Sequence, residues 1–227
     1  MILPVGDLGK TRRVPFINWL LIGANLAIFA VMVFRRGEVD PEQVYAKYAL
    51  YPDQWTVKTI FSSMFLHAGL EHVLGNMLFL YIAGDNVEDR LGHLAYLVFY
   101  LLSGVAGAAA HIVYATQFGG GGHVPTVGAS GAIAGVMGAY LIFFPGVQVR
   151  FILWLIIFVR TFTLPSWGVI GGWVASQILM ARNQWHHTAD KEATIEAVFA
   201  HLGGFAFGMV VALGARLFGK QPKRKKD

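Results

Sequence analysis

The segment ASGAIAGVMGAYLIFF, residues 129–144, contains no charged side chain and ends at Pro145-Gly146. Gly131 and Gly135 lie four residues apart, so they share one face of a helix. Small residues at that spacing let membrane helices pack closely against one another. The segment therefore predicts a membrane-spanning helix with a neighbour packed tightly against its glycine face.

The composition of the whole chain agrees with a membrane protein. Of 227 residues, 56% are hydrophobic and 14% are charged, whereas about a quarter of the residues of a soluble domain are charged. The length suits a single domain of several helices. The chain has no cysteine, which excludes disulfides, thiolate chemistry and cysteine-based metal sites.

Five more segments approach the roughly 20 apolar residues that a membrane-spanning helix needs. We expect these spans at residues 16–34, 70–82, 93–115, 167–181 and 197–218. No small-residue cleavage site follows the first, which predicts an anchor and not a removed signal peptide. Arg150, Arg160 and Pro165 interrupt residues 149–174, whose first part we expect at the membrane interface. The predicted fold is an all-α, polytopic bundle of six transmembrane helices.

The distribution of Lys and Arg predicts the orientation. Six spans put both termini on one side of the membrane, and that side carries twelve of the 18 basic residues, five of them after residue 219. By the positive-inside rule this side is cytoplasmic. A basic run can bind nucleic acid, but beside an apolar helix it marks a cytoplasmic flank, so we expect no nucleic-acid partner. We expect a cytoplasmic segment at 1–14, a membrane domain at 15–218, a basic cytoplasmic tail at 219–227, and a location in the inner (plasma) membrane of a bacterium.

The first candidate for chemistry is Ser130, in Gly128-Ala129-Ser130-Gly131. A serine at a helix start is commonly an N-cap. The alternative is a nucleophile, because a helix N-terminus offers unpaired N–H groups and positive potential that stabilise an oxyanion. The flanking glycines would allow a substrate backbone to approach.

The second candidate is His201, near the start of the last span. Gly204 and Gly208 follow three and seven residues later, so they share its helical face. Docking this face on the glycine face of residues 129–144 would bring Ser130 and His201 together. The alternative is an interfacial histidine with its polar tip in water.

The third candidate is the group His67, His72 and Asn76. His72 and Asn76 are four residues apart, share one helical face and can both donate hydrogen bonds, as an oxyanion hole requires. His67 precedes His72 by five residues, so we expect it to point elsewhere and to order the loop. Polar contact between helices is the alternative.

Together these motifs resemble the rhomboid intramembrane serine proteases. The matching pieces occur in the family's order, on the second, fourth and sixth spans, within residues 15 to 218: His67 with His72 and Asn76, Glu88-x-Arg90-x-Gly92, Gly128-x-Ser130-Gly131, and Ala200-His201-x-x-Gly204-x-x-x-Gly208.

The resemblance implies an endopeptidase that uses a Ser130–His201 dyad without a third acidic member and without a cofactor or metal. It implies an oxyanion hole made by His72, Asn76 and the Ser130 backbone N–H, and a structural role for Glu88 and Arg90. The implied substrates are membrane proteins, cut within or beside a transmembrane segment. The sequence leaves the oligomeric state open.

The chain departs from the family at two places. Relatives often have a Trp-Arg pair in the first loop, whereas here Thr56 follows Trp55. Some relatives have an aromatic residue four positions after the serine, which stacks on the histidine. Ala134 holds that position, so another group must orient His201.

Hydrolysis needs water, so we expect a polar cavity that opens to the non-cytoplasmic side and is lined by His67, His72, Asn76, Ser130 and His201. The bulky first loop and residues 185–195 are candidate lids. A transporter or metal-binding protein is one rival, but no His-x-x-x-His pair exists and few acidic residues lie within the spans. A catalytically dead relative that binds client helices is the other.

Overall fold

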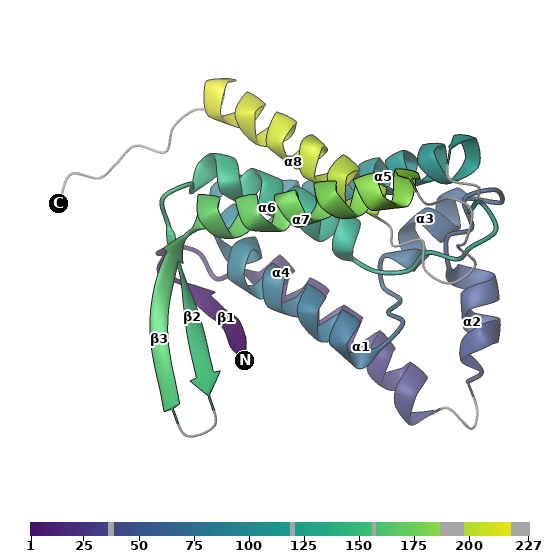
Figure 1. The fold of residues 1–227 in the computed structure, drawn as a ribbon, viewed down its shortest axis with the longest axis horizontal. Helices are drawn as coiled ribbons and strands as arrows, with labels where there is room; N and C mark the ends of the chain where they lie inside the picture. The colour runs from purple at the N-terminus through teal and green to yellow at the C-terminus, as the bar shows by residue number, and fades with distance from the viewer. Residues whose placement is uncertain (36–38, 119–120, 156–157, 187–197, 219–227) are drawn as a thin grey trace.

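The computed structural model describes residues 1–35, 39–118, 121–155, 158–186 and 198–218. In these ranges the chain forms a helical bundle with a small sheet at one end (Figure 1). In chain order the elements are β1 (Ile2–Asp7), α1 (Phe16–Phe34), α2 (Pro41–Tyr48), α3 (Val57–Ser63), α4 (Leu70–Leu91), α5 (His93–Gln117), α6 (Ser130–Phe143), β2 (Gln148–Leu155), β3 (Phe158–Pro165), α7 (Ser166–His186) and α8 (Val198–Phe218).

Helices occupy all six predicted segments. Within the described residues, α1, α5 and α8 are long and apolar enough to cross a membrane, and α6 is apolar but shorter. These helices indicate an integral membrane protein. The second helix is longer than expected: α4 runs to Leu91, where Gly92 ends it at φ +85°. Apolarity stops near Ile82, but the backbone stays helical because partners on other elements bind the polar side chains of the last turns.

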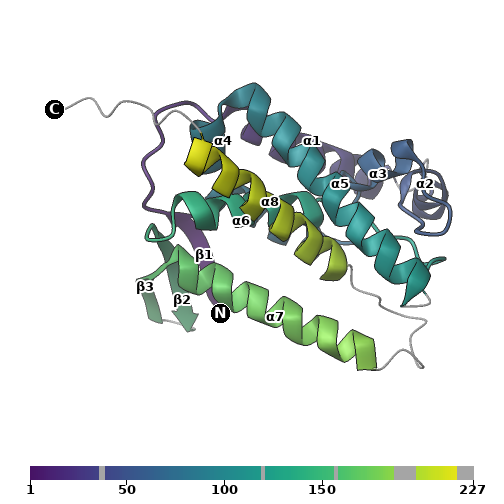
Figure 2. The same ribbon diagram turned by 90° about the horizontal axis from the view of Figure 1, so that it is seen from above.

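Helix α6 lies at the centre of the bundle, packed against α4, α5 and α8, while α7 lies along one side (Figure 2). Every residue of α6 from Gly131 to Tyr140 is buried. A helix that is apolar on all faces is stable in the interior of a protein or in a membrane. The position of α6 fixes the place of Ser130, which begins this helix.

The glycine faces of α6 and α8 pack directly on each other. A Cβ atom added to Gly204 would lie 2.0 Å from the carbonyl oxygen of Gly131, and one added to Gly208 would lie 1.9 Å from that of Gly135. Only glycine permits this approach of two backbones. The predicted docking of the two faces is therefore present in the structure.

The three-stranded antiparallel sheet contradicts the all-α prediction. Its order is β1-β2-β3, with Gln148 opposite Pro165 in the hairpin and Ile2 opposite Leu153 at the other edge. The hairpin is rich in Val, Ile, Phe, Trp and Thr, which favour strands. Because these residues are mostly apolar, the sequence predicted a segment at the membrane interface here and not a hairpin. Strand β1, which pairs with β2, lies at the start of the chain, and the sequence there did not predict a strand.

The first loop also contains structure that the sequence left as a connection. It holds α2 and α3, and α3 begins with a capping box in which Thr56 and Thr59 bond reciprocally. The amine of Lys58 lies 4.4 Å from the centre of the Tyr48 ring. Relatives often have a Trp-Arg pair at this place. This chain instead has the Thr56–Thr59 capping box and the contact of Lys58 with the Tyr48 ring. The predicted lid at 185–195 falls almost wholly outside the described residues.

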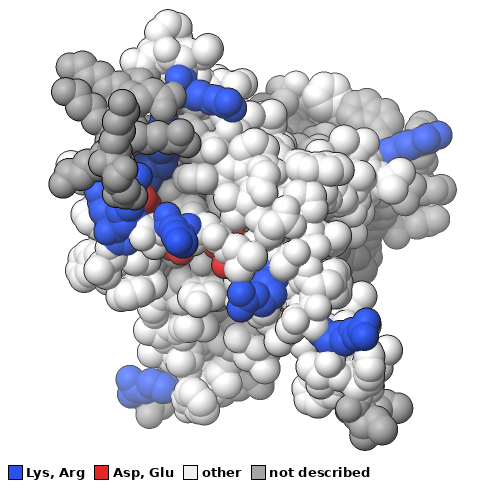
Figure 3. All heavy atoms as spheres, turned by 90° about the vertical axis from the view of Figure 1, so that its left-hand side faces the viewer, with Lys and Arg blue, Asp and Glu red and all other residues white. Residues whose placement is uncertain are grey.

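The end of the bundle that carries the sheet is rich in basic side chains, as Figure 3 shows for the face turned toward the viewer. Arg216 donates to the Ile142 carbonyl, and the Arg90 guanidinium lies 5.5 Å from the centre of the Phe143 ring. The ends of α4, α6 and α8 therefore meet here with the basic groups that the charge count assigned to the cytoplasm.

Glu88 joins the start of α1 to the end of α4. Its fully buried carboxylate accepts hydrogen bonds from the backbone N–H groups of Ile17 (3.0 Å) and Asn18 (2.7 Å), and it contacts the His93 ring. A helix N-terminus leaves such N–H groups without partners, and a carboxylate also complements its positive potential.

Glu88→Gln should lower the free energy of unfolding by about 2 kcal/mol, because the amide leaves a buried donor facing an N–H group. Asp89→Asn is the matched control, since Asp89 makes an exposed bond of the same kind to the Arg13 N–H at 2.9 Å; it should cost well under about 1 kcal/mol. Thermal unfolding in detergent measures both. Equal melting temperatures for the two variants would contradict a structural role for Glu88.

Candidate active site

The site end of the bundle is held by backbone bonds between the first loop and the loop before α6. Leu50 and Thr126 form an isolated antiparallel bridge, and the Gly128 N–H donates to the Ser63 carbonyl at 2.9 Å. Gly128 has φ +130°, which favours glycine. These bonds fix the backbone immediately before Ser130.

The Ser130 hydroxyl is hydrogen-bonded to His201. Ser130 Oγ lies 2.8 Å from His201 Nε2, across 71 residues of sequence. The N-cap of α6 is Ala129, and no side chain caps the helix. The capping role considered for Ser130 is therefore wrong, and so is an isolated interfacial role for His201. The pair has the donor–acceptor distance that base activation of a serine requires.

The other ring nitrogen of His201 is bonded to α7. His201 Nδ1 lies 2.7 Å from Oε1 of Gln177, which is almost fully buried. The Trp173 ring lies beside the imidazole, with centroids 6.0 Å apart and planes tilted by 44°. In some relatives an aromatic residue at the position of Ala134 stacks on this histidine. In this chain Gln177 and Trp173 contact the His201 ring.

His72 approaches the serine from α4. A Cβ atom added to Gly128 would lie 2.9 Å from His72 Nε2 and 3.6 Å from Ser130 Oγ. The His72 ring and the serine hydroxyl therefore flank the same backbone position. Asn76, one turn further along α4, is buried. The arrangement brings His72 to the N-terminus of α6, where backbone N–H groups point out of the helix.

His67 does not point away from His72 as the spacing suggested. The two rings are in edge-to-face contact with centroids 5.1 Å apart, because His67 precedes α4 and helical spacing does not apply to it. Burial, with a smaller contribution from His72, lowers the pKa of His67 to about 4. His67 is therefore neutral at pH 7, and its buried ring packs against the His72 ring. Its backbone carbonyl accepts from the Tyr45 hydroxyl at 3.1 Å.

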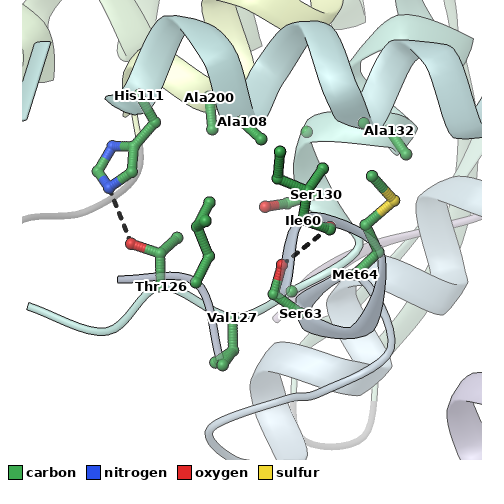
Figure 4. Close-up of a pocket in the computed structure, with 14 residues that line it drawn as sticks. Ile60, Ser63, Met64, Ala108, His111, Thr126, Val127, Ser130, Ala132 and Ala200 are labelled. Carbon is green, nitrogen blue, oxygen red and sulfur yellow. Dashed lines mark hydrogen bonds between the residues drawn. The ribbon is translucent and has the colours of Figure 1, made fainter. Parts of the chain in front are cut away.

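A cavity of about 30 Å³ lies on the side of Ser130 that faces α5 and the first loop (Figure 4). That volume is enough for a water molecule. Of the five residues predicted to line a polar cavity, only Ser130 lines this one. The other walls include Ile60, Ser63, Met64, Ala108, His111, Thr126 and Ala200. This cavity therefore lies on a different side of Ser130, where α3 and α5 form the wall, and the polar cavity lined by all five residues stays a prediction.

Sequence reasoning missed Gln177, Trp173 and His111. His111 Nε2 is bonded to the Thr126 hydroxyl at 2.8 Å, which ties α5 to the loop before α6. Gln177 and His111 are polar residues inside apolar segments, where polar side chains are costly and commonly functional. That signal was present in the sequence. Within the described ranges no three His, Asp or Glu side chains come together as metal ligands.

The fold and the site define a class: an integral membrane protein with a hydrogen-bonded serine–histidine pair at the start of a buried helix. The family model described as Rhomboid domain matches residues 54–217. The chain belongs to the rhomboid family.

Three relatives illustrate the similarity. Rhomboid protease GluP of Bacillus subtilis is 29% identical over 132 residues, which are 56% of this chain and 24% of that protein. RHOMBOID-like protein 1 of Arabidopsis thaliana is 33% identical over 107 residues, 47% of this chain and 24% of the relative. Rhomboid protein 1, mitochondrial, of Saccharomyces cerevisiae is 27% identical over 196 residues, 85% of this chain and 51% of the relative. The matched regions thus span a quarter to a half of these relatives.

Proposed function

We propose that this protein is an intramembrane serine endopeptidase that hydrolyses peptide bonds in or beside transmembrane segments of membrane proteins. The observation that carries the proposal is the 2.8 Å hydrogen bond between Ser130 Oγ and His201 Nε2 at the N-terminus of α6. Membership of a family that includes a named rhomboid protease supports the same reaction.

Ser130 is the nucleophile in this mechanism and His201 is its base. Serine attacks a carbonyl only when a base takes its proton. Nε2 can accept that proton when Nδ1 carries the ring hydrogen, and the contact of Nδ1 with Gln177 Oε1 at 2.7 Å favours that tautomer. The protonated ring then gives the proton to the leaving amine, and a water molecule repeats the sequence to release the acyl group.

The negative oxygen of the tetrahedral intermediate needs hydrogen-bond donors. We assign this role to His72, Asn76 and the Ser130 backbone N–H. The proximity of the His72 ring to Gly128 and the open N-terminus of α6 support the assignment. The potential of the helix N-terminus adds to the stabilisation.

The length of α6 supports a reaction below the membrane surface. Its 14 residues make a helix of about 21 Å, whereas the hydrocarbon core is about 30 Å thick. The end of α6 lies with the ends of α4 and α8 at the basic face, so Ser130 at its start lies at depth. A substrate helix must unwind before its carbonyls can react, so we expect helix-weakening glycine, proline or polar residues at the cut.

The proposal includes the topology expected from the sequence. Helices α1, α4, α5, α6, α7 and α8 would cross the membrane, with both termini in the cytoplasm and the site opening to the other side. The basic face formed where α4, α6 and α8 end supports this orientation. The membrane would be the inner membrane of a bacterium.

A serine-directed fluorophosphonate tests the proposal directly. The purified protein should be labelled, because Ser130 Oγ is bonded to a base, and Ser130→Ala should lose essentially all labelling. Ser62→Ala is the control: Ser62 lies on α3 and bonds the Tyr48 carbonyl at 2.7 Å. A folded wild-type protein that takes no label, or a Ser130→Ala protein that is labelled normally, would reject the proposal in favour of a client-binding relative.

A further inference from the structure

A chain of hydrogen bonds runs from the Trp173 carbonyl through Ser176 and Gln177 to His201. The donor and acceptor of each bond follow from the bond before it. The Ser176 hydroxyl donates to the Trp173 carbonyl at 2.6 Å, so its oxygen is left to accept. Gln177 Nε2 donates to that oxygen at 3.3 Å. The amide nitrogen of Gln177 is thereby turned to Ser176, and its carbonyl oxygen is turned to His201.

This orientation determines the tautomer of His201. A side-chain carbonyl oxygen can only accept, so His201 Nδ1, at 2.7 Å from Gln177 Oε1, carries the hydrogen. Nε2 is then the unprotonated nitrogen, and it lies 2.8 Å from Ser130 Oγ. A histidine with the opposite tautomer would present an N–H to the serine and could not take its proton.

The surroundings make this bond effective. Gln177 is 7% exposed, and in such a site a hydrogen bond is not weakened by competition with water. Trp173, one turn earlier on α7, packs against both His201 and Phe205, with ring centroids 6.0 and 5.9 Å apart. The imidazole is therefore held by an acceptor at one nitrogen and by an aromatic ring at its side.

We propose that Gln177 is a positioning residue of the active site, a neutral third member that holds His201 in the Nδ1–H tautomer facing Ser130. This inference rests on the proposed function, because it gives Gln177 a catalytic consequence through His201. It also explains how the chain works with Ala134 where some relatives have a stacking aromatic residue.

Two substitutions separate positioning from packing. Gln177→Met keeps the unbranched shape but removes the acceptor, and it should lower kcat about 10- to 100-fold with little change in KM, since base catalysis supplies about 10²- to 10⁴-fold. Gln177→Glu keeps an oxygen at the same reach. It should recover most of the rate at alkaline pH, and its carboxylate should move the acid limb of the pH–rate profile to higher pH by favouring the imidazolium. Ile178→Met, at an exposed neighbouring side chain, is the control.

Histidine ¹⁵N chemical shifts give an independent readout that does not depend on turnover. The wild-type protein should show His201, identified by its loss in His201→Ala, as the Nδ1–H tautomer, and Gln177→Met should show a mixture. A Gln177→Met enzyme with wild-type kcat and pH profile, or a wild-type His201 in the Nε2–H form, would overturn the inference. Absence of Ser130-dependent cleavage in the wild type would instead reject the proposed function, and the ¹⁵N spectrum would still decide the bond to Gln177.

Discussion

Ser130→Ala should lower the cleavage of a reporter transmembrane substrate by about 10⁴-fold or more, and His201→Ala should cost nearly as much. The 2.8 Å bond between the two side chains is the reason. Without the hydroxyl no acyl-enzyme forms, and without the imidazole the hydroxyl stays protonated. The two residues act as one unit, so the double variant should be no slower than Ser130→Ala alone.

The measurement is the initial rate of product formation with purified protein in detergent or vesicles. Ser62→Ala and His123→Ala are the matched controls, because Ser62 bonds a loop carbonyl and His123 is an exposed residue of the loop before α6. Both should retain rates within about threefold of wild type, as substitutions away from packed or reacting groups usually do. A double variant tenfold slower than either single variant would show that Ser130 and His201 act separately.

The sequence predicted the parts of the site that depend on helical periodicity. Gly131 and Gly135 in residues 129–144, and Gly204 and Gly208 in residues 197–218, are four residues apart. Each pair shares one helical face, and this does not depend on tertiary contacts. The structure packs these faces together, with Gly204 against Gly131. The meeting of Ser130 with His201 follows from that packing, since each lies near the end of its glycine face.

The parts that the sequence did not predict depend on contacts across the chain. Gln177 reaches His201 only because α7 lies beside α8. Gly168 and Gly172 of α7 are also four residues apart, but they do not mark this contact, since a Cβ atom added to Gly172 would meet nothing within 4 Å. The sheet needs residues 2–7 to pair with β2 more than 140 residues later. The ring contact of His67 with His72 arises from a loop turn, which helical spacing does not describe. Local periodicity carries no information on these contacts.

Gly208→Ala should have the largest effect on stability. The new Cβ atom would lie 1.9 Å from the carbonyl oxygen, 2.6 Å from the carbonyl carbon and 2.7 Å from the Cα of Gly135. All three are backbone atoms of α6, so no side chain can move aside. The helices must separate, and we expect a loss of about 3 kcal/mol or more in the free energy of unfolding, at the upper end of overpacking costs.

Gly214→Ala on the same helix is the matched control, because nothing lies within 4 Å of its added Cβ atom. Alanine is the better helix former, by up to about 1 kcal/mol, so this variant should melt at or above the wild-type temperature. Thermal unfolding in detergent compares the two variants directly. Equal melting temperatures would contradict the close packing of α6 on α8.

The same separation of α6 and α8 in Gly208→Ala should also lower the rate of cleavage. Ser130 begins α6 and His201 lies on α8, so a shift between the helices changes the Ser130–His201 distance. A misplacement of 1 Å at a reacting group can cost about 10²-fold in rate. Gly208→Ala should therefore lose at least that factor in cleavage even below its melting temperature, whereas Gly214→Ala should cleave at the wild-type rate. A Gly208→Ala protein that is destabilised yet fully active would show that the site is positioned independently of the glycine contact.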